Sequence, residues 1–276
     1  MVAPALIAIL AVAPRILIYT ATEGCRHESI ETATAALFQL GKQHNIKFDH
    51  TEDRTLFNDK KLANYDALLF LNNNDGVLNE SGKQAFQRYL NKGGNYVGVH
   101  GGGACLYNTT FYQREALFLI TIRIYNLRYT FLVLDKTHPS TKHLPDRWTY
   151  TEEVYHFRQN PRDVGAKILL SVDRNSYHDD VNRTQAQGSP HPIAWYQERG
   201  AGAENSRNAG RSFYTSLGHL NSTWGDETFL SHVLGGISWA LDSNTTLWRN
   251  PKGKVGARPR PREGRSGIEE DQNEIT

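Results

Sequence analysis

The sequence has few cysteines, almost no net charge and no pair of closely spaced cysteines, and each shortage excludes a class of protein. Its 276 residues include two cysteines, Cys25 and Cys105, and no CxxC pair, which excludes a disulfide scaffold and a paired-cysteine metal site. The net charge is +2, and the whole excess lies from Arg249 onward, where seven Lys/Arg accompany five Asp/Glu. The remainder is neutral, so charge gives no reason to expect nucleic acid or a membrane as partner.

The first 13 residues, MVAPALIAILAVA, are apolar and too short to span a bilayer. They lack Lys and Arg but end in Ala11-Val12-Ala13, a small-x-small pattern that resembles a signal-peptide cleavage site. Five Asn-x-Ser/Thr sequons agree with secretion; they begin at Asn79, Asn108, Asn182, Asn221 and Asn244. We therefore expect residues 1–13 to be a signal peptide of a secreted glycoprotein, with a cytoplasmic protein as the alternative.

Residues 14–242 alternate short apolar runs with amphipathic stretches, which predicts an α/β domain. The first half predicts strands over 15–21, 46–50, 67–71 and 95–100, and helices over 28–43, 59–64 and 79–91. The second half predicts strands over 131–134, 151–157, 166–172, 192–197 and 211–217, and a closing helix over 226–241. This order predicts a mainly parallel, doubly wound sheet. Residues 243–276 are rich in Pro, Gly and charge, and we expect a disordered tail.

Three histidines follow predicted strands, and in open α/β sheets ligands bind beyond the carboxyl ends of the strands. His100 ends one strand and runs into Gly101-Gly102-Gly103, which permits close approach of a ligand. His27 follows the first strand, and His219 follows a late one. These are the candidate catalytic residues, although each also fits a polar loop position without function.

Arg26 lies beside His27 and is suited to binding a substrate carboxylate or phosphate. Eleven histidines in one domain suggest a divalent metal such as zinc, but no HExxH or similarly tight spacing occurs, so ligands would come from distant segments. Cys105 lies five residues beyond His100, away from the strand-end turn, which argues against a cysteine nucleophile. Whether Cys25 and Cys105 form a disulfide stays open.

The strings ILIYTATEGCRHESI, DALLFLNNNDGVLNE, FQRYLNKGGNYVGVHGGG, EEVYHFRQNPR, HPIAWYQ and RSFYTSLGH resemble the ThuA-like (trehalose-utilisation) family over about Arg15 to Leu241. That family resembles class I glutamine amidotransferases, which implies a flavodoxin-like three-layer sandwich. In those enzymes the elbow reads G-x-C-x-G, and here His100 occupies the cysteine position. The resemblance therefore implies the fold without glutaminase chemistry.

The resemblance further implies a small carbohydrate or keto-sugar as ligand, with some relatives binding metal. Tyr155 and Trp195 are the expected substrate-binding aromatics, together with Trp224, although aromatic residues more often belong to the core. Residues 115–130 (EALFLITIRIYNLRYT) depart from the family pattern. The leading hypothesis is an enzyme acting on a carbohydrate or its oxidised derivative. The alternative is a non-catalytic carbohydrate-binding or pseudo-enzyme domain.

Overall fold

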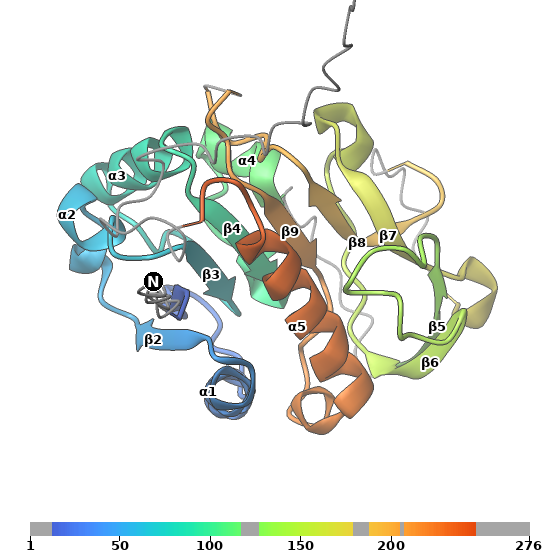
Figure 1. Ribbon diagram of the computed structural model, residues 1–276. Coiled ribbons are helices and arrows are strands. Elements are labelled where there is room, and N and C mark those ends of the chain that lie inside the picture. Colours follow the sequence, from blue (N-terminus) through green and yellow to red (C-terminus); the bar gives the residue numbers. More distant parts are fainter. Residues whose placement is uncertain (1–12, 117–126, 179–187, 205–206, 247–276) are drawn as a thin grey trace, which may run out of the picture.

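The computed structural model describes residues 13–116, 127–178, 188–204 and 207–246 (Figure 1). Residues 1–12 of the expected signal peptide, residues 247–276 of the expected tail and most of the atypical segment 115–130 lie outside these ranges. The expected tail begins too early, because Ser243 and Thr246 are buried. Secretion and glycosylation therefore stay predictions. Among the described residues, none of the helices combines the length and apolarity needed to cross a bilayer.

Within the described ranges, nine strands form one sheet with the order β2-β1-β3-β4-β9-β8-β7-β5-β6. The pairings from β2 to β9 are parallel, and those from β9 to β6 are antiparallel. The strands are β1 (Arg15–Tyr19), β2 (Lys47–Thr51), β3 (Ala67–Leu71), β4 (Asn95–Val99), β5 (Leu127–Val133), β6 (Arg147–Glu152), β7 (Lys167–Val172), β8 (Pro192–Gln197) and β9 (Ser212–Thr215). The α/β expectation is confirmed, but the expected mainly parallel sheet is corrected to a mixed one.

Helices cover both faces of the parallel half, as Figure 1 shows. They are α1 (Ile30–His44), α2 (Asp59–Leu62), α3 (Glu80–Asn91), α4 (Thr110–Ala116) and α5 (Glu227–Leu241). Ile16 and Ile18 of β1 pack in the core with α1 and α5, whereas Leu17 and Tyr19 pack with α3 and α4. Successive strand residues point to opposite faces, so a strand buried on both sides must be apolar throughout. The flavodoxin-like sandwich is not confirmed, because the other half of the sheet is antiparallel.

The expected strand over 151–157 is placed wrongly, because β6 ends at Glu152. The N–H of Glu153 donates to the Glu152 carboxylate at 2.9 Å instead of to a neighbouring strand. The next residues, among them Tyr155 and Phe157, are buried without the alternation of a strand exposed on one face. The chain thus leaves the sheet where β6 ends and brings Glu153 to the site described below.

Candidate metal and catalytic site

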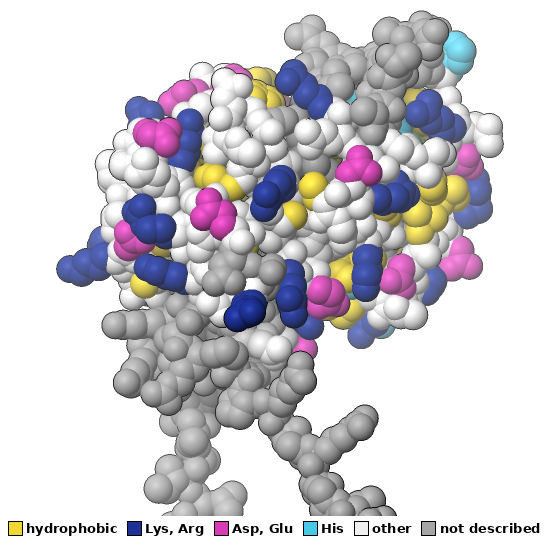
Figure 2. Space-filling model, turned by 90° about the horizontal axis from the view of Figure 1, so that it is seen from above, with side chains coloured by type: hydrophobic (Ala, Val, Ile, Leu, Met, Phe, Trp, Pro, Cys, Tyr) yellow, Lys and Arg dark blue, Asp and Glu magenta, His cyan; other side chains and the backbone are white. Residues whose placement is uncertain are grey.

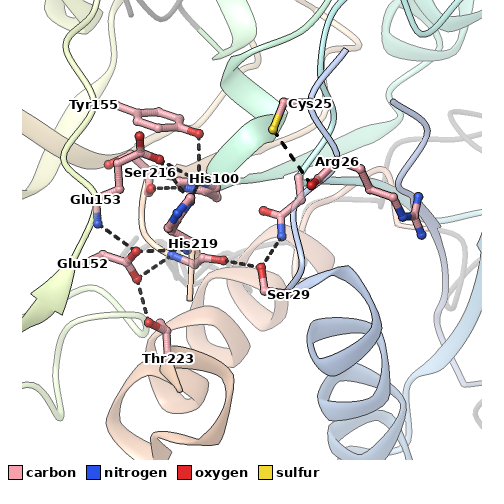
Figure 3. A network of polar contacts seen from close by, with 12 residues as sticks. Cys25, Arg26, Ser29, His100, Glu152, Glu153, Tyr155, Ser216, His219 and Thr223 are labelled. Atoms are coloured by element: carbon pink, nitrogen blue, oxygen red, sulfur yellow. Dashed lines mark hydrogen bonds and ion pairs between the residues drawn. The ribbon is translucent and has the colours of Figure 1, made fainter. Parts of the chain in front are cut away.

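Four side chains converge at one edge of the sheet, and we call them the edge cluster. Each offers one ligand atom, and these atoms all lie within 4.8 Å of one another. The members are His27, His100, Glu153 and His219. His27 follows β1, His100 follows β4, His219 follows β9 and Glu153 follows β6. The three histidines predicted from the sequence therefore meet at the carboxyl ends of the parallel strands, where ligands bind in such sheets. Figure 3 shows His100 and His219 beside Glu153.

His100 occupies a backbone conformation that non-glycine residues rarely adopt, with φ of 48°. The turn that follows needs glycine: a Cβ at Gly101 would lie 2.6 Å from the Asn73 carbonyl oxygen, and one at Gly102 would lie 2.7 Å from that of Phe70. Asn72, at the end of neighbouring β3, also has a positive φ, of 52°. Such strain is typical of functional sites and persists only where surrounding contacts enforce it.

The hydrogen bonds of His100 fix which ring nitrogen faces the edge cluster. Nδ1 lies 2.7 Å from the Ser216 carbonyl oxygen, which can only accept, so Nδ1 carries the proton. In the neutral ring, Nε2 therefore presents a lone pair. This Nε2 lies 3.1 Å from His219 Nδ1 and 3.3 Å from Glu153 Oε2. The hydroxyl of Tyr155 donates to it at 2.9 Å.

Electron-rich atoms thus face one another, and a positive charge must lie among them. His219 Nδ1 and Glu153 Oε2 are 3.2 Å apart. Burial lowers the pKa of His219, but the hydrogen bond and charge of Glu153 outweigh burial and leave that pKa raised. Burial raises the pKa of Glu153, but His100 and His219 outweigh it and leave that pKa well below its usual range. The edge cluster is therefore completed either by a proton on His219 or by a metal ion.

His27 closes the cluster from the β1 side. Its ring centroid lies 4.8 Å from that of His100 and 5.4 Å from that of His219. Burial, followed by the charges of the other two histidines, lowers the pKa of His27 to about 3, so the imidazole is neutral at pH 7. Its Nδ1 is buried and has no hydrogen-bond partner among the described residues. A buried acceptor without a partner is costly, and a coordinated cation would satisfy it.

The donor set fits a divalent metal. Three imidazoles and one carboxylate are typical zinc ligands, bound at about 2.0–2.2 Å in tetrahedral sites. Two ligands at such lengths are about 3.3 Å apart in a tetrahedron. Three ligand pairs among His100, Glu153 and His219 measure 3.1, 3.3 and 3.2 Å. His27 would supply the fourth ligand.

The other predicted site residues divide between the site and the core. Tyr155 is buried, with its ring centroid 4.5 Å from that of His100, so it lies at the site. Trp195 is buried against Phe157 and Tyr214, which places it in the core rather than on a sugar-binding surface. Trp224 is likewise buried. Both tryptophans differ from the expected surface position because Trp195 lies on a buried strand and Trp224 in a buried turn.

Arg26 lies beside His27 in sequence, but its guanidinium forms ion pairs with Glu31 at 2.8 Å and Glu52 at 2.9 Å. Both cysteines are free thiols, Cys25 exposed and Cys105 buried. Burial raises the pKa of the Cys105 thiol to about 12, which argues further against a nucleophilic thiolate.

Sequence reasoning missed Glu152 and Glu153 as site residues because both seemed to lie within a strand. The signal that could have found them is the pair itself. Two adjacent carboxylates in an otherwise apolar, aromatic run (EEVYHF) are unusual, since buried carboxylates need dedicated partners.

Comparison with known proteins supports the assignment that the residues suggested. A family profile described as ThuA, Trehalose utilisation, matches residues 15–240. The chain belongs to the ThuA family. Similar solved structures include a ThuA-like protein from Bacteroides uniformis, which is 21% identical with a TM-score of 0.67 and covers 84% of this chain and 93% of that one. Another, from Parabacteroides merdae, is 20% identical with a TM-score of 0.62 and covers 89% and 92%.

At these identities the ThuA-like structures show a shared fold. None of the curated proteins matches the chain. The resemblance inferred from the motifs is thus confirmed, and family membership supports a role related to trehalose utilisation.

Proposed function

We propose that this ThuA family member is a metal-dependent enzyme that acts on a carbohydrate or a keto-sugar derivative. The observation that carries the proposal is the edge cluster, whose four ligand atoms lie within 4.8 Å of one another. The carbohydrate as substrate class rests on the family description, which names trehalose utilisation. A divalent metal held there would act as a Lewis acid toward an oxygen of the substrate, which would join the four protein ligands in an expanded coordination shell.

The protein's own groups have separate roles in this proposal. His100 and His27 enter as neutral imidazoles, the first because Ser216 holds its Nδ1 proton and the second because burial disfavours its charged form. Glu153 enters as a carboxylate and offsets part of the metal's charge. The Tyr155 hydroxyl, 2.9 Å from His100 Nε2, lies close enough to donate to an oxygen bound in the cluster.

The buried aromatic residues favour the enzyme over a carbohydrate-binding module. Binding modules commonly stack sugars on exposed aromatic rings. The four tryptophans that the structure describes are all buried; they are Trp148, Trp195, Trp224 and Trp239. On the face seen in Figure 2, Lys/Arg and Asp/Glu side chains are interspersed, so the described part of that face offers no single-sign patch for a charged macromolecule.

Metal analysis and turnover test the proposal together. The purified protein should contain about one divalent metal per chain, and Glu153→Gln should lose most of it. Conversion of trehalose or of its keto derivatives should stop after chelation and return when zinc, manganese or iron(II) is added back. Glu80→Gln, an exposed glutamate on α3, is the matched control and should keep both metal and turnover. Sugar binding without metal and without turnover would instead establish the binding module.

A further inference from the structure

Glu152 is a completely buried carboxylate that lies beside the edge cluster without belonging to it. Four donors converge on its two oxygens. Oε1 accepts the N–H of Glu153 at 2.9 Å and that of His219 at 3.0 Å. Oε2 accepts the N–H of Gly218 at 3.1 Å and the hydroxyl of Thr223 at 2.8 Å. Figure 3 shows the bonds of Glu152 to Glu153, His219 and Thr223.

Two of the four donors are backbone N–H groups of cluster residues. Oε1 joins the main chain of Glu153 to that of His219, two cluster members 66 positions apart in the sequence (219 − 153 = 66). The two segments come from distant strands, because β6 and β9 are separated by β8, β7 and β5 in the sheet. One side chain therefore links the end of the antiparallel half to the end of the parallel half.

We propose that Glu152 is the positioning residue of this site and sets the affinity of the edge cluster for its metal. The inference rests on the proposed metal-binding function. By holding both backbones, Glu152 fixes the separation of Glu153 Oε2 and His219 Nδ1 at 3.2 Å. Partners that orient metal ligands typically change metal affinity about 10–100-fold when removed.

Glutamine is a sharp test of this role because it preserves shape but not acceptor capacity. Each oxygen of Glu152 accepts from two donors. In Glu152→Gln, one oxygen becomes an NH2 group, so in either orientation two donors face a donor. The turn at Gly218 and His219 or the N–H of Glu153 must then move.

The experiment compares cobalt(II) and zinc binding in the wild type, Glu152→Gln and Glu115→Gln. Glu115 is the matched control: it is also fully buried and accepts a backbone N–H, from Gly202 at 2.8 Å, but it lies on α4 outside the cluster. We expect Glu152→Gln to weaken metal binding about 10–100-fold and to alter the visible absorption of bound cobalt. Glu115→Gln should change neither. Cobalt affinity of Glu152→Gln within twofold of the wild type would overturn the proposal.

Two further measurements keep the result decisive. Thr223→Val removes one donor from Oε2 and should weaken metal binding by a smaller factor than Glu152→Gln. This milder variant tests the same role if Glu152→Gln fails to fold. Amide hydrogen exchange needs no metal: Gly218 and His219 should lose protection in Glu152→Gln but not in Glu115→Gln. In Thr223→Val, the expected loss is confined to Gly218, which shares Oε2 with the Thr223 hydroxyl. If the wild type binds no metal, the proposed function fails, and the exchange data alone then decide whether Glu152 positions the turn. Unchanged protection of the Gly218 and His219 amides in Glu152→Gln would refute the positioning role.

Discussion

Two groups of buried or half-buried histidines in the described part of the protein have opposite surroundings. The edge cluster places a carboxylate and histidine lone pairs against one another. The second group, which we call the core pair, consists of His232, a residue of α5, and His138, whose ring centroid lies 4.9 Å from that of Trp239 on the same helix. His138 stacks on Tyr196 with ring centroids 4.5 Å apart.

The hydrogen bonds of His232 are complete without any cation. His232 Nδ1 donates to the Ser140 carbonyl at 3.0 Å, and its Nε2 accepts the Thr215 hydroxyl at 3.1 Å. His138 Nδ1 accepts the N–H of Ser140 at 3.2 Å, so Nε2 of the neutral ring carries the proton. This Nε2 is buried without a partner among the described residues, but it is a donor, which a cation cannot satisfy. The core pair therefore offers no site for a cation, whereas the edge cluster needs a proton or a metal. A high histidine count therefore carries little information, and the partners of each ring decide its role.

The largest effect that we expect is a loss of folding stability in acid. Burial lowers the pKa of His27 and His191 to about 3 and that of His138 and His232 to about 4. Below about pH 6.5 these histidines become protonated in the unfolded chain but stay neutral in the folded protein. The free energy of unfolding therefore falls as the pH drops from about 6.5 toward 4. The loss should reach several kcal/mol, since each pKa unit corresponds to about 1.4 kcal/mol. His219 has a raised pKa, so it adds stability as the pH falls, but it is one group against four.

Urea unfolding at pH 7, 5.5 and 4.5, with and without a chelator, checks this expectation and separates the two groups. The contribution of the core pair should not depend on metal. That of the edge cluster should become steeper with metal bound, because ligands coordinate only when deprotonated. Stability that stays flat from pH 7 to 4.5 would contradict the buried, neutral state of all four histidines.

Two substitutions, one in each group, test the comparison through the second-largest effect that we expect. His100→Ala should reduce zinc affinity at least about 100-fold, because it removes a ligand of the cluster. His232→Ala should keep zinc affinity but lower the free energy of unfolding by about 2–4 kcal/mol, because it opens a cavity and strands the Thr215 and Ser140 groups. Chelator competition and urea unfolding on both variants provide the measurements. Equal zinc loss in the two variants would show that the cluster is not a discrete site.

The sequence predicted individual strands closely in both halves of the sheet, but not their direction. Ala67–Leu71 and Pro192–Gln197 were predicted to the residue because continuous apolar runs are typical of strands buried on both faces. The mixed sheet was not predicted, since strand direction depends on pairing across distant segments. His27, His100 and His219 could be placed at the sheet edge from their positions after strands. Glu153 could not, because its place depends on the departure of the chain from β6, which the buried Glu152 enforces.

The smallest effect that we expect comes from removing one hydroxyl beside each group, and the two stability losses should differ. The Tyr155 hydroxyl donates to His100 Nε2 at 2.9 Å, and the Thr215 hydroxyl donates to His232 Nε2 at 3.1 Å. Thr215→Val leaves a buried acceptor without a partner, which costs about 1–3 kcal/mol. Tyr155→Phe should cost less than about 1 kcal/mol, because His100 Nε2 keeps His219 or a metal as its partner. Zinc affinity should stay equal or rise in Tyr155→Phe, since the hydroxyl no longer competes for the lone pair. A larger stability loss in Tyr155→Phe than in Thr215→Val would mean that His100, like His232, depends on its neutral donor and that the contrast between the two groups is wrong.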